Sequence, residues 1–227
     1  MRKPKKLTAD ELAPFQVDLP EANPFRKPVP GEPETLQREL NWVELFGNRN
    51  PVEVEVGFGK GLFLVTSAVA NPGTNYFGIE IVRKYQLYAT NRIARRKLPN
   101  AKTCCADAKQ VLARHIAPGS VDTIHVFFPD PWWKTKHKKR LLFTPEFAQS
   151  IVRVLRPGGV LHFVTDVADY FAMVSELLAT MPILAPLPPP EASPGATDMD
   201  YLTNFERKFR REGRPIHRSR YRRDETS

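Results

Sequence analysis

The sequence has only two cysteines and no long hydrophobic run, which excludes several classes of protein. Cys104 and Cys105 are adjacent, and neighbouring residues of an extended strand point to opposite faces, so a disulfide bond between them is not expected. The five histidines show no i, i+3 or i, i+4 pairing, so we expect no metal. No apolar run approaches the roughly 20 residues that span a membrane, and no apolar segment follows the basic N-terminus as in a secretory signal. We therefore expect a cytoplasmic protein with no membrane partner.

Basic residues are in excess, and they are concentrated in separate parts of the sequence. The formal net charge is +9 over 227 residues. Residues 1–6 contain four basic residues, residues 134–140 contain five, and residues 207–223 contain nine against one acid. An evenly solvated surface would not separate charge in this way, so the distribution favours a polyanionic partner.

The length and hydrophobic content predict one α/β domain with extensions. Hydrophobic residues make up 41% of the chain, which is enough for one core. Residues 1–33 contain seven prolines without hydrophobic periodicity, so we expect an extended, flexible arm there. We assign residues 34–210 to the domain and residues 211–227 to a basic C-terminal tail.

Within the domain, apolar runs of strand length alternate with helical segments, which is typical of βαβ units on a parallel sheet. We expect a doubly wound sheet with helices on both faces. A short helix is expected at 35–46, and the stretch 182–196 is expected to be a loop. The predicted strands are 52–56, 75–79, 101–106, 121–128 and 160–164, and the predicted helices are 62–70, 82–97 (a basic segment), 108–115 and 146–155.

Acidic residues follow the ends of four predicted strands. They are Glu80, Asp107, Asp130 and Asp166. The carboxyl ends of parallel strands line the ligand crevice of an open sheet, so these acids are expected to converge on one site. Any one of them could instead cap a helix, but that explanation is less suited to all four together.

A glycine-rich turn, with the spacing G-x-G-x-G, follows the first strand of the domain. The dinucleotide fingerprint is G-x-G-x-x-G, and a pyrophosphate would avoid the nearby carboxylate of Glu55. S-adenosylmethionine carries an amino group and a sulfonium, which that carboxylate favours. Glu80 stands where a carboxylate accepts the ribose hydroxyls, and Asp107 stands where the adenine amino group would be reached. The glycines of the turn are Gly57, Gly59 and Gly61.

The segment Phe127 to Trp133 places one carboxylate, Asp130, between two prolines and beside aromatic rings. Prolines fix the backbone, and aromatic side chains stack on unpaired bases, contributing about 1–3 kcal/mol per base. The basic run from Lys134 to Arg140 follows directly and matches a loop that contacts phosphates. Together these features favour a nucleobase substrate over ordinary core tryptophans.

Five segments together resemble the bacterial tRNA (guanine-N(7)-)-methyltransferase family, over roughly residues 40–210. F-P-D-P-W followed by a basic run, together with a late T-x-F-E, is more specific than the glycine turn. The segments are Val54–Gly61, Gly78–Glu80, Phe128–Trp132, Thr165–Asp166 and Thr203–Glu206.

The resemblance implies a class I methyltransferase fold, Rossmann-like, with a mostly parallel sheet and a C-terminal antiparallel strand. It also implies S-adenosylmethionine as methyl donor, no metal, and guanine 46 in the variable loop of tRNA as acceptor. Asp130 is then the catalytic candidate, and it contacts the donor together with Glu55, Glu80, Asp107 and the three glycines. The residues implied to contact tRNA are Lys134, Asp166, Thr203, Asn204, Phe205 and Glu206.

Two positions depart from the family pattern, and some alternatives stay open. Leu141 stands where a second arginine is usual, and Asn204 stands where a basic residue is also common.

Three alternative functions stay open, because they use related sequence features. They are a nicotinamide-dependent dehydrogenase, a catalytically silent RNA-binding protein and a methyltransferase for an exocyclic amine. Either Asp130 or Asp166 is expected to stabilise the methylated guanine. No obligate protein partner is evident, and the protein is expected to be a monomer or a homodimer.

The lone histidines His125 and His162 fall within predicted strands. We expect both to be buried and neutral rather than catalytic.

Overall fold

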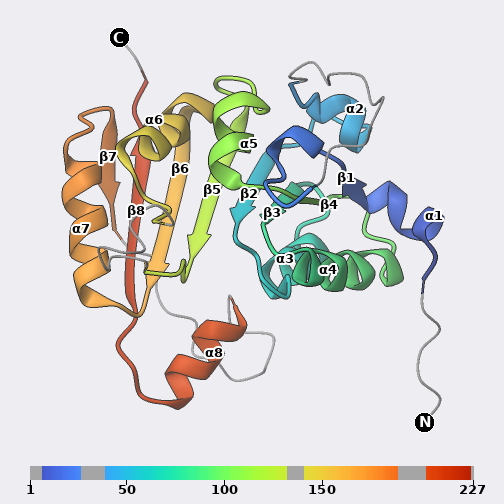
Figure 1. Ribbon diagram of the computed structural model, residues 1–227. Coiled ribbons are helices and arrows are strands. Elements are labelled where there is room, and N and C mark those ends of the chain that lie inside the picture. The colour runs from blue at the N-terminus through green and yellow to red at the C-terminus, as the bar shows by residue number, and fades with distance from the viewer. Residues whose placement is uncertain (1–6, 27–38, 132–140, 189–202, 226–227) are drawn as a thin grey trace.

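The computed structural model describes residues 7–26, 39–131, 141–188 and 203–225, which form one α/β domain (Figure 1). Its centre is an eight-stranded sheet with the order β1-β4-β3-β2-β5-β6-β8-β7. Neighbouring strands from β1 to β6 are parallel, and β8 runs antiparallel to both β6 and β7. The strands are β1 (Gln16–Val17), β2 (Val52–Val56), β3 (Asn75–Glu80), β4 (Ala101–Cys105), β5 (Val121–Phe127), β6 (Leu155–Thr165), β7 (Leu184–Leu187) and β8 (His217–Arg223).

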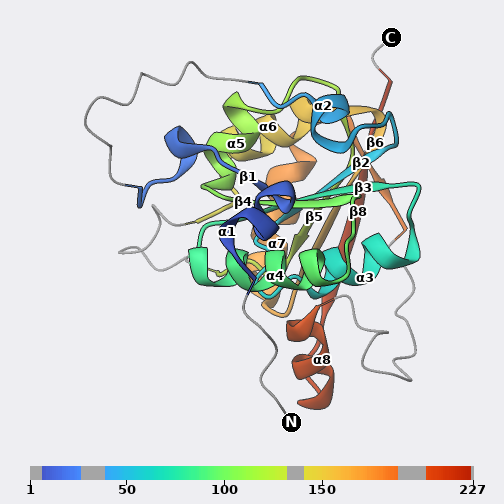
Figure 2. The same cartoon turned by 90° about the vertical axis from the view of Figure 1, so that its right-hand side faces the viewer.

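Helices cover both faces of this sheet, as expected for parallel strands that are hydrophobic on both sides (Figure 2). On one face α5, α6 and α7 bury a large aliphatic and aromatic core against the central strands. On the other face α3, α4 and α8 contribute to a second, smaller core. The helices are α1 (Ala9–Leu12), α2 (Trp42–Phe46), α3 (Leu62–Ala70), α4 (Arg83–Arg95), α5 (Ala108–Arg114), α6 (Pro145–Val154), α7 (Ala168–Ala179) and α8 (Asn204–Arg211), with short 3-10 helices η1 (Ala13–Phe15) and η2 (Pro20–Ala22).

The predicted βαβ alternation is confirmed from β2 to β6. The predicted bounds of β2 and α3 agree with the structure, and the other central elements differ by one or two residues at their ends. β6 is the exception, because it begins at Leu155 and includes the segment Arg156 to Gly159, which lies before the predicted strand 160–164. The pairing of β5 with β6 shifts register between Val121 and Thr123, so the extra residues form a bulge and do not end the strand.

The expectation of an extended, flexible arm at residues 1–33 is wrong for residues 7–26. Thr8 and Glu11 form a capping box that begins α1, and β1 pairs with β4 at the edge of the sheet. The side chain of Gln86 on α4 donates to Gln16 on β1, with 3.1 Å between Nε2 and Oε1. Sheet pairing and this buried amide hold the segment in place despite its prolines.

The expected loop at 182–196 and the expected tail at 211–227 also need correction. Residues 184–187 form β7, and residues 217–223 form β8, which lies inside the sheet between β6 and β7. Tyr221 of β8 is buried in the main core, and that contact explains how so basic a segment becomes an inner strand. The antiparallel strand implied by the family resemblance is therefore confirmed. In the described ranges, none of the helices has both the length and the apolar character needed to cross a bilayer.

Candidate active site

A cleft of about 640 Å³ opens at the edge of the sheet where the parallel strands end. The ends of β2, β3, β4 and β5 all contribute to it, as the topology of an open parallel sheet requires. Three of the acids predicted from strand ends, Glu80, Asp107 and Asp130, line the cleft together with Gly57 and Gly59. The structure therefore brings these predicted site residues together.

The glycine turn after β2 has a left-handed backbone at all three of its glycines, Gly57, Gly59 and Gly61. At Gly61 a side chain is also excluded by space, because an added Cβ would lie 2.6 Å from the Cβ of Ala89 on α4. The missing side chain lets α3 begin directly at the turn and pack closely against α4. At Gly59 an added Cβ would meet nothing within 4 Å, so this residue faces open space in the cleft wall.

Glu80, the last residue of β3, connects two walls of the cleft through its carboxylate. Its Oε2 accepts from the Gly59 amide at 2.8 Å and its Oε1 accepts from the Val82 amide at 2.9 Å. Burial raises the pKa of this carboxyl, and the backbone hydrogen bonds oppose that rise. Glu80 thus holds the glycine turn while its carboxylate lines the cleft.

Asp107 caps a helix and also lines the cleft. Its side chain caps α5 by accepting from the Lys109 amide at 2.9 Å, and it also lines the cleft. Its own amide donates to the carbonyl of Ala22 at 2.7 Å, so the N-terminal segment contacts this wall of the cleft.

The backbone at Phe128 directs Asp130 into the cleft. Phe128 has φ +50°, a conformation that a bulky residue rarely adopts and that is less favourable still before Pro129. The Phe128 amide donates to the Val164 carbonyl at 2.7 Å, and the Phe128 ring packs on Phe209 with 5.4 Å between centroids. These contacts compensate for a strained turn, and the exposed side chain of Asp130 lies at the cleft.

Glu55 and Asp166 are not among the described residues that line the cleft. Glu55 is buried next to Glu80, and desolvation, followed by the charge of Glu80, raises its pKa well above the usual value. One of its oxygens, Oε2, has no hydrogen-bond partner among the described residues. The carboxylate of Asp166 forms an ion pair with Arg214, which also stacks on the Phe209 ring.

Three relatives of known name are similar to this chain over most of its length. A tRNA (guanine-N(7)-)-methyltransferase from Rhodopirellula baltica is 44% identical over 212 residues, covering 87% of this chain and 78% of the relative. Proteins of the same name from Alkalilimnicola ehrlichii (35% identical; 99% and 92% covered) and Geobacter metallireducens (34%; 84% and 90%) also match. The chain belongs to the tRNA (guanine-N(7)-)-methyltransferase family.

Two further comparisons agree with membership of this family. A family model described as "Putative methyltransferase" matches residues 49–219. Among solved structures, the 16S rRNA methyltransferase KamB superposes with a TM-score of 0.60 at 17% identity (83% and 96% covered). The aminoglycoside resistance methyltransferase NpmB1 gives 0.56 at 22% identity (79% and 92% covered). At these identities the solved structures show the fold, which is the expected class I methyltransferase fold.

The family motif from Thr203 to Glu206 forms the first turn of α8. The Thr203 hydroxyl accepts from the Glu206 amide at 3.0 Å, which caps the helix. The carboxylate of Glu206, only 2% exposed, accepts from Arg210 at 2.7 Å and from Arg218 on β8 at 2.5 Å. In the structure Thr203 caps α8 and Glu206 fixes it to β8, and the predicted contact of both residues with tRNA stays a prediction.

Several residues of the predicted site lie outside the described residues. They are Lys134, Trp132 and the side chains of Asn204 and Phe205. Their assignment to substrate binding stays a prediction from the family motif.

Sequence reasoning missed part of the cleft wall. Phe25, which is 75% exposed, and Tyr85 line the cleft, as do the apolar residues Ile81 and Val82 that follow Glu80. Phe25 belongs to the N-terminal segment that we expected to be flexible. The available signal for Ile81 and Val82 was an apolar pair directly after the strand-end acid Glu80.

The lining of the cleft fits S-adenosylmethionine, the methyl donor of this family. It combines a carboxylate at the end of β3, room beside Gly59, and apolar surface from Ile81, Val82 and Phe25. The described residues contain no group of three His, Cys, Asp or Glu side chains arranged to hold a metal.

Proposed function

We propose that this protein methylates N7 of a guanine in tRNA, at position 46 of the variable loop, with S-adenosylmethionine as donor. The observation that supports this most directly is the convergence of Glu80, Asp107 and Asp130 with the glycine turn in one cleft. Relatives that are 44% and 35% identical to this chain over most of its length carry the corresponding name. The dehydrogenase alternative is not supported, because the relatives that cover most of this chain are methyltransferases.

Within the cleft, we assign each acid a separate task. Glu80 accepts the ribose hydroxyls, and its two backbone hydrogen bonds keep the carboxylate in a fixed orientation. Asp107 is placed for the adenine amino group, and Ile81 with Val82 provides apolar surface for the ring. Glu55 lies buried behind the glycine turn, where desolvation raises its pKa and favours the neutral carboxyl, so we assign it a role in supporting the turn rather than a charge beside the donor.

The reaction does not require the protein to remove a proton from the guanine N7 atom. When bound, S-adenosylmethionine supplies a methyl group on a sulfonium, and guanine N7 has a lone pair and no proton to lose. The protein therefore contributes mainly proximity and electrostatic stabilisation. We assign the stabilisation of the positively charged methylated guanine to Asp130, which is exposed in the cleft, rather than to Asp166, which is neutralised by Arg214.

Methyl transfer from labelled S-adenosylmethionine to unmodified tRNA, followed by nucleoside digestion, tests the proposal. We expect labelled 7-methylguanosine from wild-type tRNA and no label when position 46 is changed from guanine to adenine. Label on another nucleoside would reject the acceptor assignment. No label from a protein that still binds the donor would favour the RNA-binding alternative.

Replacement of Asp130 by Asn tests its role in the chemical step. We expect turnover to fall about 100-fold, which is typical for loss of one electrostatic group at the reacting centre. Affinity for tRNA should stay nearly unchanged, because phosphate contacts dominate it. Unchanged turnover of the Asp130→Asn variant would remove Asp130 from the mechanism.

A further inference from the structure

The outer face of α4 has an unusual combination of positive charge and exposed aromatic rings. From residue 81 to residue 106 the chain contains seven basic residues and no acid. α4 occupies the first half of this stretch. Its buried side chains, Gln86, Ala89, Thr90, Ile93 and Ala94, share one face of the helix.

The opposite face of α4 forms one continuous stripe. At 3.6 residues per turn, the residues Lys84, Tyr85, Tyr88, Arg92, Arg95 and Arg96 lie within about a third of the helix circumference. Tyr85 is 39% exposed and Tyr88 is 51% exposed, which is unusual for large aromatic side chains. From Lys84 to Arg96 the stripe extends about 18 Å at 1.5 Å per residue.

The stripe is continuous with the cleft. Tyr85 and Val82 line the cleft at the start of α4. Further along, the guanidinium of Arg92 donates to the carbonyl of Lys60 in the glycine turn at 3.0 Å. A ligand on the outer face of α4 would therefore lie beside the groups that hold the methyl donor.

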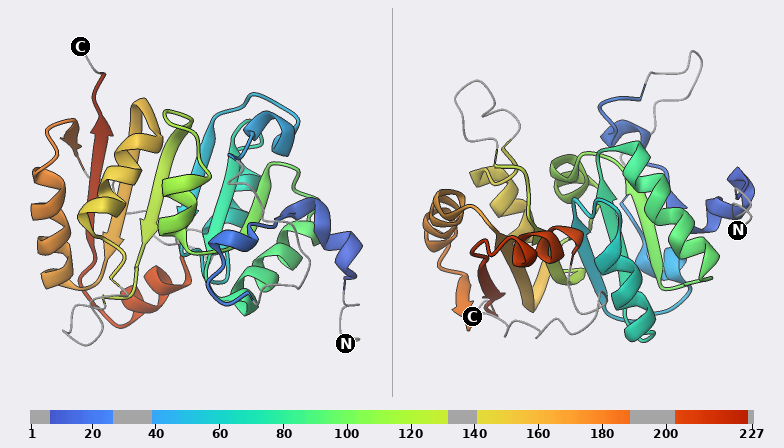
Figure 3. Two further views of the ribbon diagram at one scale, coloured as in Figure 1. Left: turned by 45° about the horizontal axis from the view of Figure 1, so that its top comes forward. Right: turned by 90° about the horizontal axis from the view of Figure 1, so that it is seen from below.

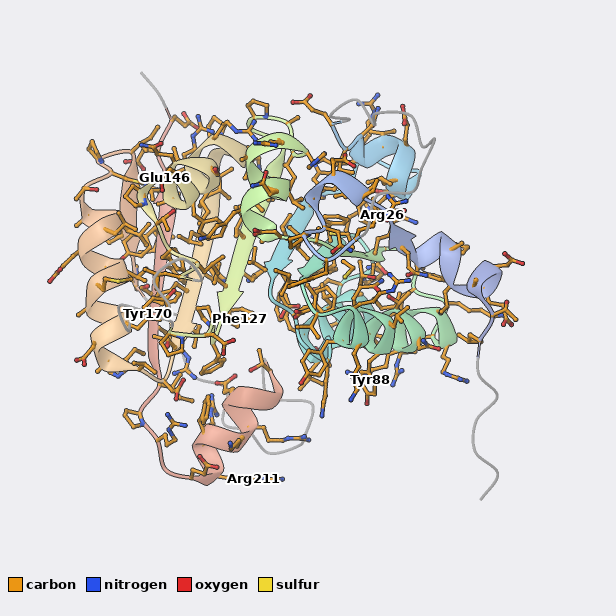
Figure 4. All side chains as sticks on the ribbon, in the orientation of Figure 1. Arg26, Tyr88, Phe127, Glu146, Tyr170 and Arg211 are labelled. Atoms are coloured by element: carbon orange, nitrogen blue, oxygen red, sulfur yellow. The ribbon has the colours of Figure 1, made fainter. Side chains whose placement is uncertain are left out.

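A second basic helix lies on the same side of the molecule. α8 carries Lys208, Arg210 and Arg211 in its last turn. Figure 4 shows Tyr88 and Arg211 on the side at which β5 ends, and the view from below in Figure 3 shows α8 together with α3 and α4. The cleft thus opens on a face with basic residues on two helices.

We propose that the outer face of α4 is a docking surface for the RNA substrate, on which Lys84 and Arg96 bind backbone phosphates and Tyr88 stacks on an unpaired base. The proposal rests on the proposed function and adds the surface that holds the substrate. Charge complementarity favours RNA as the ligand of this surface, because a stripe with several cations and no carboxylate matches a backbone of phosphates. Exposed tyrosines among the cations suit single-stranded or looped RNA, whose bases are free to stack.

Binding of tRNA as a function of salt concentration tests the phosphate contacts. The double variant Lys84→Gln/Arg96→Gln is expected to bind tRNA about 10-fold more weakly at 0.1 M salt. The slope of log affinity against log salt should become shallower by about 2, since two phosphate contacts are lost. The matched control is Arg49→Gln/Arg114→Gln, which removes the same charge at exposed positions before β2 and at the end of α5, away from the cleft.

Tyr88 provides an independent test of stacking. Tyr88→Ala is expected to weaken tRNA binding about 5-fold or more, whereas Tyr88→Phe keeps the ring and should restore wild-type affinity. Affinity for S-adenosylmethionine should stay at the wild-type value in all of these variants, which confirms that the cleft is folded. If the Lys84/Arg96 and Tyr88→Ala variants bind tRNA as tightly as the control, with the wild-type salt slope, the docking proposal is wrong.

The two proposals fail in different ways. The proposed function is wrong if the wild-type protein forms no 7-methylguanosine in tRNA. The docking proposal is wrong if the wild-type protein forms that product while the α4 variants keep wild-type affinity for tRNA.

Discussion

Close packing of the glycine turn against α4 leads to a quantitative prediction for Gly61. Replacement of Gly61 by Ala places a Cβ at φ +64°, which costs an L-residue about 1–2 kcal/mol. The same Cβ would lie 2.6 Å from the Cβ of Ala89, which is fully buried and has no rotamer that moves it away. Overpacking of this kind adds about 1–3 kcal/mol. We therefore expect Gly61→Ala to lower the free energy of unfolding by about 2–5 kcal/mol.

The same turn contains a matched control. Gly59 also has a left-handed backbone, but an added Cβ there would meet nothing within 4 Å. Gly59→Ala should cost only the backbone term, about 1–2 kcal/mol. Equilibrium urea denaturation of both variants, followed by circular dichroism, measures the difference. If Gly61→Ala is no more destabilising than Gly59→Ala, the steric argument is refuted.

A compensating change at Ala89 provides a second check. Ala89→Gly alone should cost about 1 kcal/mol, because glycine is unfavourable inside a helix. In the double variant Gly61→Ala/Ala89→Gly the two Cβ atoms no longer collide, so about 1–3 kcal/mol of the Gly61→Ala cost should be recovered. Costs that simply add would show that the two residues do not interact.

Three other predictions concern single carboxylates and one histidine. Glu80→Gln leaves one of the two backbone donors facing an NH₂ group, so affinity for S-adenosylmethionine in calorimetric titration should fall about 10-fold or more. Glu206→Gln removes the buried carboxylate that accepts from the partly buried Arg210 and Arg218 and should lower the free energy of unfolding by about 3 kcal/mol, whereas Lys208→Gln on the exposed side of α8 should change it little. Burial, with the neighbouring His125 and Arg220, lowers the pKa of His162 to about 3, against 6.5 for an unperturbed histidine. Below pH 6.5 the imidazole of His162 therefore binds a proton in the unfolded chain but stays neutral in the folded protein. This difference lowers the free energy of unfolding by about 2 kcal/mol as the pH falls from 7 to 5. The stability difference between wild type and His162→Gln should change by that amount over this range; a constant difference would show that His162 is not held neutral.

The parts of the fold that sequence patterns predicted are those in which local pattern and tertiary structure agree. For the strand Val52 to Val56 and the helix Leu62 to Ala70, the local sequence alone indicates the apolar positions and the boundaries. β1 and β8 depend instead on partners far along the chain. In β1, Gln16 pairs with Thr103 of β4. The segment from His217 to Arg223 lies between two other strands, although this segment is strongly basic. Burial of Tyr221 from this segment could not be inferred without knowing its neighbours.

The same distinction applies to the candidate site. Strand ends and a glycine turn predicted the position of Glu80, Asp107 and Asp130, because the edge of a parallel sheet collects such residues. The distinction between Asp130, which faces the cleft, and Asp166, which is paired with Arg214, depends on a side chain nearly 50 positions later in the chain. Phe25 was missed because only its tertiary position makes it part of the cleft wall.

The position of β8 in the sheet has a consequence for the order in which the molecule folds. Among the described strands β8 comes last in the chain, yet it lies between β6 and β7 and pairs with both. During synthesis, β6 and β7 therefore have unpaired edges until the segment from His217 to Arg223 has emerged. The sheet is completed from the inside by its last strand, so a nascent chain interrupted before His217 would present an open strand edge to its neighbours.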